Sequence, residues 1–103
     1  MVVYNGQGMK TYANAKRWTQ IFRVFANINR MKIVKILAGS EKLAVGDIAG
    51  KLDISLNATS KHLLMLHDLD ILECRGKDNH VYYWLSAEMP ADARKVVDLF
   101  IGG

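Results

Sequence analysis

The sequence predicts a mainly α-helical domain with one small β-hairpin. Two observations support this prediction: apolar residues recur at helical spacing over most of the chain, and after Asp70 the pattern becomes extended, with β-branched and aromatic residues on both sides of a polar cluster. A chain of 103 residues, 50% of them hydrophobic, fits one compact domain. We expect that domain to span residues 13–103, after a mobile N-terminal arm over residues 1–12.

Five helices are predicted from the spacing of apolar residues and from the capping side chains that precede them. A short helix, a tight turn and a longer helix follow one another in the middle of the chain, which is typical of a helix-turn-helix. The expected segments are the stretch after Asn14, residues 30–37 after a cap at Asn27, residues 45–52, residues 56–69 after a cap at Ser55, and a last helix that Pro90 begins after a cap at Ser86.

A β-hairpin is expected directly after the fourth helix. Its strands cover residues 71–75 and 80–85, and residues 76–79, with the sequence Gly-Lys-Asp-Asn, form its turn. A hairpin that follows a helix-turn-helix is a wing. The predicted architecture is therefore a winged helix-turn-helix of five helices and a two-stranded wing, in the order α-α-α-α-β-β-α.

The charges are unevenly distributed along the chain. The first 40 residues hold seven of the 14 basic residues and none of the ten acidic ones, although the whole chain carries a formal charge of only +4. A basic segment ahead of a slightly acidic body is typical of a protein that binds a polyanion. A solvated helix face would carry the same charges, so charge alone does not decide between the two interpretations.

Composition argues against several classes of protein. Cys74 is the single cysteine, so neither an internal disulfide nor a cysteine-rich zinc site can form, which fits a reducing compartment. No apolar run has the length of a signal peptide or a membrane span, so we expect a cytoplasmic protein without membrane contact. No Ser-His-Asp arrangement, paired carboxylates or glycine-rich phosphate loop is recognisable, and we expect no enzymatic activity.

The fourth helix and the hairpin carry the candidate DNA contacts. Polar side chains on the first turns of that helix can reach base edges and phosphates, and basic side chains on the wing can reach phosphates. A polar strip that only faces solvent is the alternative. The candidate contacts are Ser55, Asn57, Ser60, Lys61, Arg75, Lys77 and Asn79.

Two apolar stripes, on the first and last helices, flank the helix-turn-helix and the wing. A domain of this size buries only part of its surface, so a second copy of the chain is expected to cover these stripes. We therefore expect a homodimer. The candidate interface residues are Trp18, Ile21, Phe22 and Phe25 on the first helix, and Met89, Ala93, Val96, Val97 and Phe100 near the last one.

Four segments in a fixed order point to a known family: Phe25-Ala26-Asn27 with Arg30, residues 43–49, residues 55–66 and residues 81–85 (Val-Tyr-Tyr-Trp-Leu). Together they resemble the ArsR family of bacterial and archaeal repressors. The resemblance implies a homodimeric transcriptional regulator that binds double-stranded DNA, with residues 56–69 in the major groove and the wing, residues 71–85, on the flanking backbone. It also implies repression that an inducer relieves, here an unknown small molecule.

The chain departs from the metal-sensing members of this family. Ala44 and Gly46 stand where those members carry cysteines, and no histidine follows Pro90. His62 and His67 are five residues apart, which does not place them on one helix face, so we expect no metal or other cofactor. Two alternatives stay open: a winged helix that binds another protein, and a metal- or thiol-responsive repressor with an unrecognised sensing site.

Overall fold

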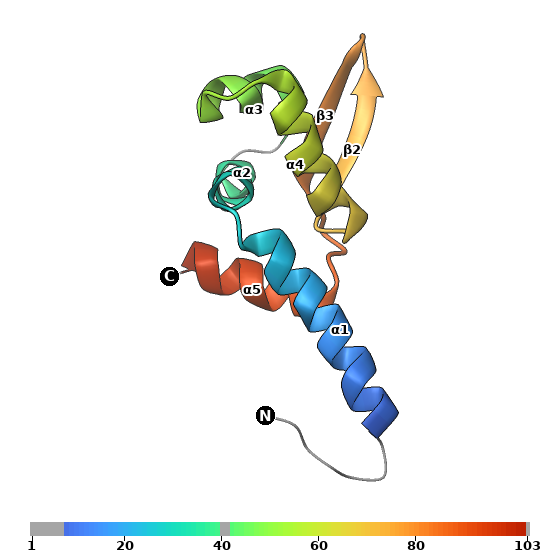
Figure 1. Ribbon diagram of the computed structural model, residues 1–103. Helices are drawn as coiled ribbons and strands as arrows, with labels where there is room; N and C mark the ends of the chain where they lie inside the picture. Colours follow the sequence, from blue (N-terminus) through green and yellow to red (C-terminus); the bar gives the residue numbers. More distant parts are fainter. Residues whose placement is uncertain (1–7, 40–41, 103) are drawn as a thin grey trace.

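The computed structural model describes residues 8–39 and 42–102 of the chain. These residues form five helices and a small antiparallel sheet, which confirms the predicted fold class. Helix α2 lies at the centre, with α1 and α5 on one side and α3, α4 and the β2–β3 hairpin on the other (Figure 1). The elements are α1 (Gly8–Phe25), α2 (Ile28–Ala38), β1 (Leu43–Ala44), α3 (Val45–Leu52), α4 (Leu56–Asp68), β2 (Leu72–Lys77), β3 (His80–Leu85) and α5 (Ala91–Gly102).

One hydrophobic core joins all of these helices to the base of the wing. Ile33, Val34 and Leu37 of α2 are buried at its centre, because their spacing places them on one face of the helix. Each fully buried aliphatic side chain of this kind stabilises the fold by about 1.5–3 kcal/mol. The other elements contribute Ile21, Val24, Phe25, Ile48, Leu63, Leu66, Ile71, Leu72, Tyr83, Met89, Ala93 and Val97 to the same cluster.

The sheet has one strand more than the sequence predicted. Its order is β1-β3-β2, and both pairings are antiparallel. In β1, Leu43 pairs with Tyr83 and Ala44 pairs with Tyr82. The predicted two-stranded wing is therefore part of a three-stranded sheet. Strand β1 was not predicted because two residues are too few to show the alternation by which a strand is recognised.

The wing also closes in a tighter turn than predicted. Lys77 pairs with His80 across the hairpin, so only Asp78 and Asn79 connect the strands, whereas the prediction gave the turn to residues 76–79. Both turn residues have positive φ angles, 53° and 64°. Asp and Asn tolerate this conformation, and a two-residue turn of this kind matches the right-handed twist of a hairpin.

Two of the predicted helix caps are confirmed. The Oδ1 atom of Asn27 accepts a hydrogen bond from the backbone N–H of Arg30, at 3.1 Å, and begins α2. The Oγ atom of Ser55 accepts one from the N–H of Ala58, at 3.0 Å, and begins α4. Each bond satisfies a donor that the first turn of a helix otherwise leaves without a partner.

The first helix begins earlier than predicted, and the last helix lacks the predicted cap. Helix α1 starts at Gly8 instead of after a cap at Asn14, so residues 8–12 of the expected arm are helical. Residues 1–7 of that arm lie outside the described residues. Ser86 does not cap α5, because its Oγ atom accepts the N–H of Glu88 in a turn, at 3.1 Å. The helix starts directly after Pro90, whose carbonyl accepts the N–H of Arg94 at 2.9 Å.

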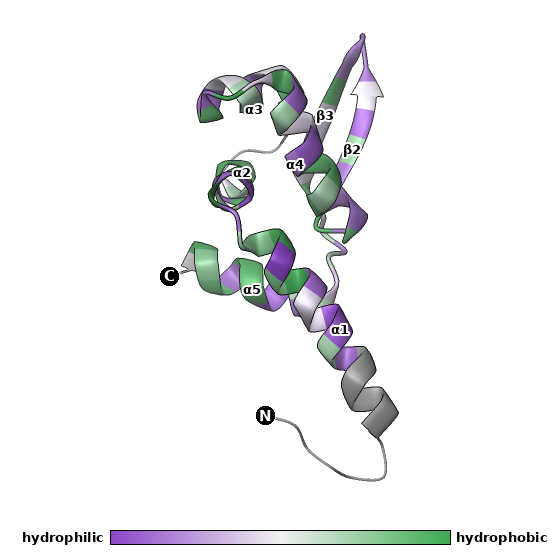
Figure 2. Cartoon of the chain, in the orientation of Figure 1, coloured by the Kyte–Doolittle hydropathy of each residue, from purple (hydrophilic) through white to green (hydrophobic). Residues whose placement is uncertain are grey.

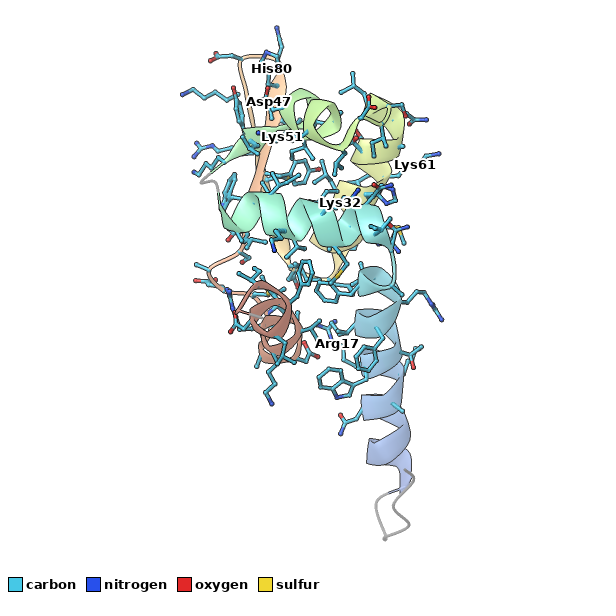
Figure 3. The ribbon with its side chains drawn as sticks, turned by 90° about the vertical axis from the view of Figure 1, so that its left-hand side faces the viewer. Arg17, Lys32, Asp47, Lys51, Lys61 and His80 are labelled. Atoms are coloured by element: carbon cyan, nitrogen blue, oxygen red, sulfur yellow. The ribbon has the colours of Figure 1, made fainter. Side chains whose placement is uncertain are left out.

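An ion pair joins α1 to α5. Arg17 points from α1 towards α5 (Figure 3) and donates two hydrogen bonds to the carboxylate of Asp92, at 2.8 and 3.1 Å. This hydrogen bonding lowers the pKa of Asp92, since it favours the charged carboxylate. The ion pair therefore stabilises the contact between α1 and α5 only while Asp92 is ionised.

We predict that Asp92→Asn lowers the free energy of unfolding by about 0.5–1 kcal/mol at pH 7, the range of a well-formed pair near the surface. The wild-type contribution is complete above the ordinary pKa of 3.8 and disappears as the pH falls through the lowered pKa. Urea unfolding at several pH values measures this. Asp98→Asn is the matched control, because Arg94 and Asp98 are 3.8 Å apart on one exposed helix face; an equal loss in both variants would contradict the prediction.

Candidate nucleic-acid interface

A three-residue turn orients α4 relative to α3. Asp53 adopts a left-handed conformation, with φ 56° and ψ 47°, and this ends α3. The N–H of Ile54 then bonds to the carbonyl of Ala49, at 3.3 Å, before Ser55 begins α4. A short polar side chain tolerates the left-handed region at low cost, which explains an aspartate at this position. The helix-turn-helix predicted from the sequence is thus present.

Helix α4 has one buried face and one polar, exposed face. Thr59, Leu63 and Leu66 are buried, and the Thr59 hydroxyl donates to the carbonyl of Ser55 at 2.8 Å. Asn57 and Lys61 are exposed, and Ser60 is half-buried. Ser55 is exposed as well, but its side-chain oxygen is engaged in capping the helix.

The wing places further basic groups beside α4. Arg75 and Lys77 of β2 and Asn79 of the turn are exposed. The backbone geometry of the turn accounts for an asparagine at position 79, since its φ angle is positive. Helix α3, the N-terminal end of α4 and the tip of the wing all lie towards the same end of the molecule (Figure 1).

Lys61 and the wing tip lie on opposite sides of this end. In Figure 3, Lys61 extends outwards from α4, away from His80 of the wing and from Asp47 and Lys51 of α3. The candidate DNA contacts therefore fall into two groups. Ser55, Asn57, Ser60 and Lys61 belong to α4, and Arg75, Lys77 and Asn79 belong to the hairpin.

Arg30 of α2 is only 7% exposed, and its guanidinium group connects α4 to the C-terminal end of α1. Its Nε atom donates to the carbonyl of Val24 at 2.6 Å, and Nη2 donates to that of Arg23 at 3.2 Å. Its Nη1 atom lies 3.2 Å from Nδ1 of His62 and 3.3 Å from Sδ of Met65, both on α4. The cation is thus held by helix carbonyls, whose dipoles favour positive charge at that end.

His62 must accept a hydrogen bond from Arg30, because a guanidinium group can only donate. The Nδ1 atom of His62 is therefore unprotonated. Burial and the neighbouring charge of Arg30 both lower the pKa of His62. Protonation of His62 would therefore place a second positive charge next to that of Arg30, which already lies in this contact.

This role of Arg30 was not predicted from the sequence. Its position relative to Ile33, Val34 and Leu37 corresponds to the i, i+3, i+4, i+7 pattern of a buried helix face. A single arginine on an otherwise apolar face is the signal that would have revealed it, because a buried charge requires several partners.

The residues expected at the dimer interface divide into two classes. Ile21, Phe25, Met89, Ala93 and Val97 are buried in the core of the single chain, so their side chains are not available to a partner. Phe22 is 59% exposed, and its ring stacks on that of half-buried Trp18, with 5.5 Å between centroids. Val96 and Phe100 are half-buried.

The described residues contain no group of three or more His, Cys, Asp or Glu side chains that could hold a metal ion. His62 bonds to Arg30, His80 lies at the start of β3 in the wing, and Cys74 is exposed on β2. None of the described helices combines the length and the apolar character that crossing a membrane requires.

We predict that the free energy of unfolding falls as the pH drops below the ordinary histidine pKa of 6.5, and levels off below the lowered pKa of folded His62. The unfolded chain binds a proton in this window and the folded chain does not. His62→Gln should remove this part of the pH dependence, since the amide oxygen still accepts from Arg30. His67→Gln, which leaves that contact intact, should retain it. Identical pH profiles for wild type and His62→Gln would refute the assignment.

Comparison with known proteins gives a consistent result. Residues 28–73 match the family described as "Bacterial regulatory protein, arsR family". The arsenical resistance operon repressor of Escherichia coli is 35% identical over 79 residues, which cover 77% of this chain and 68% of that protein. The transcriptional repressor SdpR of Bacillus subtilis is 30% identical over 73 residues, covering 71% and 80%.

A solved structure shares the fold as well. It is the homodimeric winged helix-turn-helix DNA-binding domain of Mb0332 from Mycobacterium bovis, described as a possible ArsR-family transcriptional regulator, with a TM-score of 0.75 and 25% identity. The similarity covers 93% of this chain and 85% of that one. The sequence matches and the common fold together show that the chain belongs to the arsR family of bacterial regulatory proteins.

Proposed function

We propose that the protein is a transcriptional repressor that binds specific double-stranded DNA sites as a homodimer in the cytoplasm. The observation that supports this best is the exposed polar face of α4 beside a wing with exposed basic side chains. Family membership supplies the regulatory role, because the relatives are transcriptional repressors and regulators.

The first half of α4 is proposed to enter the major groove. Asn57 is exposed there, and a carboxamide can pair with adenine through two hydrogen bonds. Lys61 lies one turn further and can reach either guanine or a phosphate. Base contacts from these positions would choose the site. Ser55 and Ser60 are the further proposed contacts of α4, to the adjoining backbone.

The wing is proposed to contact the DNA backbone beside the groove. Arg75 and Lys77 are both exposed on β2, and cationic side chains bind phosphates without regard to sequence. These two residues would therefore raise affinity for any duplex. Asn79 at the turn is the third proposed wing contact.

A second copy of the chain is proposed to cover the exposed apolar side chains of α1 and α5. Phe22 is 59% exposed and Leu99 is 77% exposed, with Trp18 stacked on the former. Hydrophobic residues gather along α5 and the neighbouring part of α1 (Figure 2). Removing this surface from water would drive association, and a two-fold dimer would present two copies of α4 to successive turns of the major groove.

We predict that the Arg75→Ala, Lys77→Ala double variant binds all duplexes more weakly. Each lost phosphate contact should lower the slope of log affinity against log salt by roughly 1, so a symmetric dimer should lose about 4. Asn57→Ala should instead cost about 1–3 kcal/mol per half-site on the preferred sequence, with little change in slope. Affinities measured over a salt series distinguish the two.

Lys95→Ala is the control for lost charge, since Lys95 is an exposed residue of α5, on the other side of α2 from α4 and the wing (Figure 1). Its salt slope should equal that of the wild type. An unchanged slope in the Arg75, Lys77 double variant would remove the wing from the interface and favour a winged helix that binds another protein.

We predict that Leu99→Asp yields a monomer at micromolar concentration and weakens DNA binding, because the dimer would have to bury an unpaired carboxylate. Folding should be unaffected, as Leu99 is 77% exposed in the single chain. Ile28→Asp on α2, at a position 69% exposed, is the matched control and should remain dimeric. Sedimentation that gives the same mass for both variants would contradict the proposed interface.

A further inference from the structure

We propose that the outer face of the wing binds a mononucleotide, meaning a planar base joined to a phosphate. A hollow of about 720 Å³ opens on this face, a volume in the range of small-molecule sites. Cationic and aromatic side chains form most of its wall. The lining residues are Lys42, Arg75, Gly76, Lys77, Asp78, Tyr82 and Trp84.

The strand register explains why these side chains share one face. Arg75 pairs with Tyr82, and two residues further along each strand Lys77 pairs with His80. Alternate residues of a strand point to the same side of the sheet, so Trp84 lies on this face too. Tyr83, between the two aromatic residues of the hollow, points the other way and is buried in the core. Tyr82 and Trp84 are thus not part of that core.

The charge of the hollow favours a phosphate. Lys42, Arg75 and Lys77 supply three positive charges, and Asp78 is the single acidic residue in the lining. Neither of the two salt bridges found within residues 8–39 and 42–102 involves any of these three cations. A phosphate group carries up to two negative charges, and clusters of arginine and lysine are the usual means of binding one.

The aromatic residues favour a planar ring beside that phosphate. The Nζ atom of Lys42 lies 4.1 Å from the centroid of the Trp84 ring, in a cation–π contact that holds the ammonium group at this end of the hollow. Tyr82 is two residues away on the same strand, about 6.6 Å along it. Both rings are half-buried, and each has a cation beside it: Arg75 pairs with Tyr82 across the strands, and Lys42 lies over Trp84. Aromatic rings next to cations form a stacking surface for nucleobases.

This inference rests on the proposed function, because Arg75 and Lys77 are also the proposed phosphate contacts of the wing. A nucleotide bound to them would compete with the DNA backbone and would lower the affinity of the protein for its site. Lys42 and Trp84 are not among the proposed DNA contacts, so they separate the two roles experimentally.

The test uses adenosine and cytidine 5′-monophosphates as probes of the full chain, followed by NMR of the two tryptophan indole N–H groups. Trp84 should shift and saturate, whereas Trp18, on α1, should not respond. Adenosine alone and inorganic phosphate alone should each bind at least about tenfold more weakly, because each loses one part of the site. No saturable shift with either nucleotide up to 10 mM, or binding of a single-stranded oligonucleotide only, would overturn the proposal.

Two variants test the charges of the hollow. Lys42→Gln should weaken binding of adenosine monophosphate about tenfold. Asp78→Asn, which the positive φ angle of the turn tolerates, should strengthen it up to about fivefold. Lys35→Gln is the matched control, since Lys35 also lies over a ring, that of Phe100 at 5.7 Å, but outside the hollow. An equal loss in the Lys35 and Lys42 variants would refute the site.

Duplex binding distinguishes failure of this inference from failure of the proposed function. Without nucleotide, Lys42→Gln should bind DNA like the wild type. Added nucleotide should lower the duplex affinity of the wild type. The same decrease in Lys42→Gln should need about tenfold more nucleotide. Normal duplex binding that nucleotides never reduce would overturn only the nucleotide site, whereas loss of all duplex binding in the wild type would overturn the proposed function as well.

Discussion

The contact between α1, α2 and α4 depends on one buried cation. Arg30 leaves water almost completely and is compensated by two backbone carbonyls, an imidazole nitrogen and a thioether, with no carboxylate among these partners. A buried charge is tolerated only when such bonds replace its hydration. The position of α4 relative to the end of α1 is therefore set by directional hydrogen bonds as well as by apolar packing, which has no preferred direction.

This arrangement places two functional elements on either side of one side chain. Helix α1 carries the stacked Trp18–Phe22 pair proposed for dimerisation, in which Phe22 is exposed, and α4 carries the polar face proposed for DNA. Arg30 bonds to backbone carbonyls of α1 and to His62 of α4. A rigid link of this kind would transmit the geometry of a dimer to the spacing of its two recognition helices, which must match the helical repeat of DNA.

The wing serves two purposes because a strand has two faces. Leu72 and Tyr83 point inwards and extend the hydrophobic core under the sheet, while Arg75 and Tyr82 face outwards. Because the inner face anchors the hairpin in the core, the outer face can carry charged and aromatic side chains. The short β1 strand adds to the base of this sheet and brings Lys42 next to Trp84.

The sequence by itself determined the class of fold, the position of the helix-turn-helix and two helix caps, because these depend on local periodicity and on side chains within a few residues of one another. The caps at Asn27 and Ser55 are examples. Only the tertiary structure decided the third strand, the partners of Arg30, and which apolar residues of α1 and α5 enter the core instead of facing outwards. Ile21 and Phe22 are neighbours in the chain, yet one is fully buried and the other is 59% exposed. Such differences arise from contacts between residues far apart in the sequence, such as Arg17 with Asp92 and Arg30 with His62. Local sequence patterns cannot predict these contacts, because such patterns extend over only a few residues.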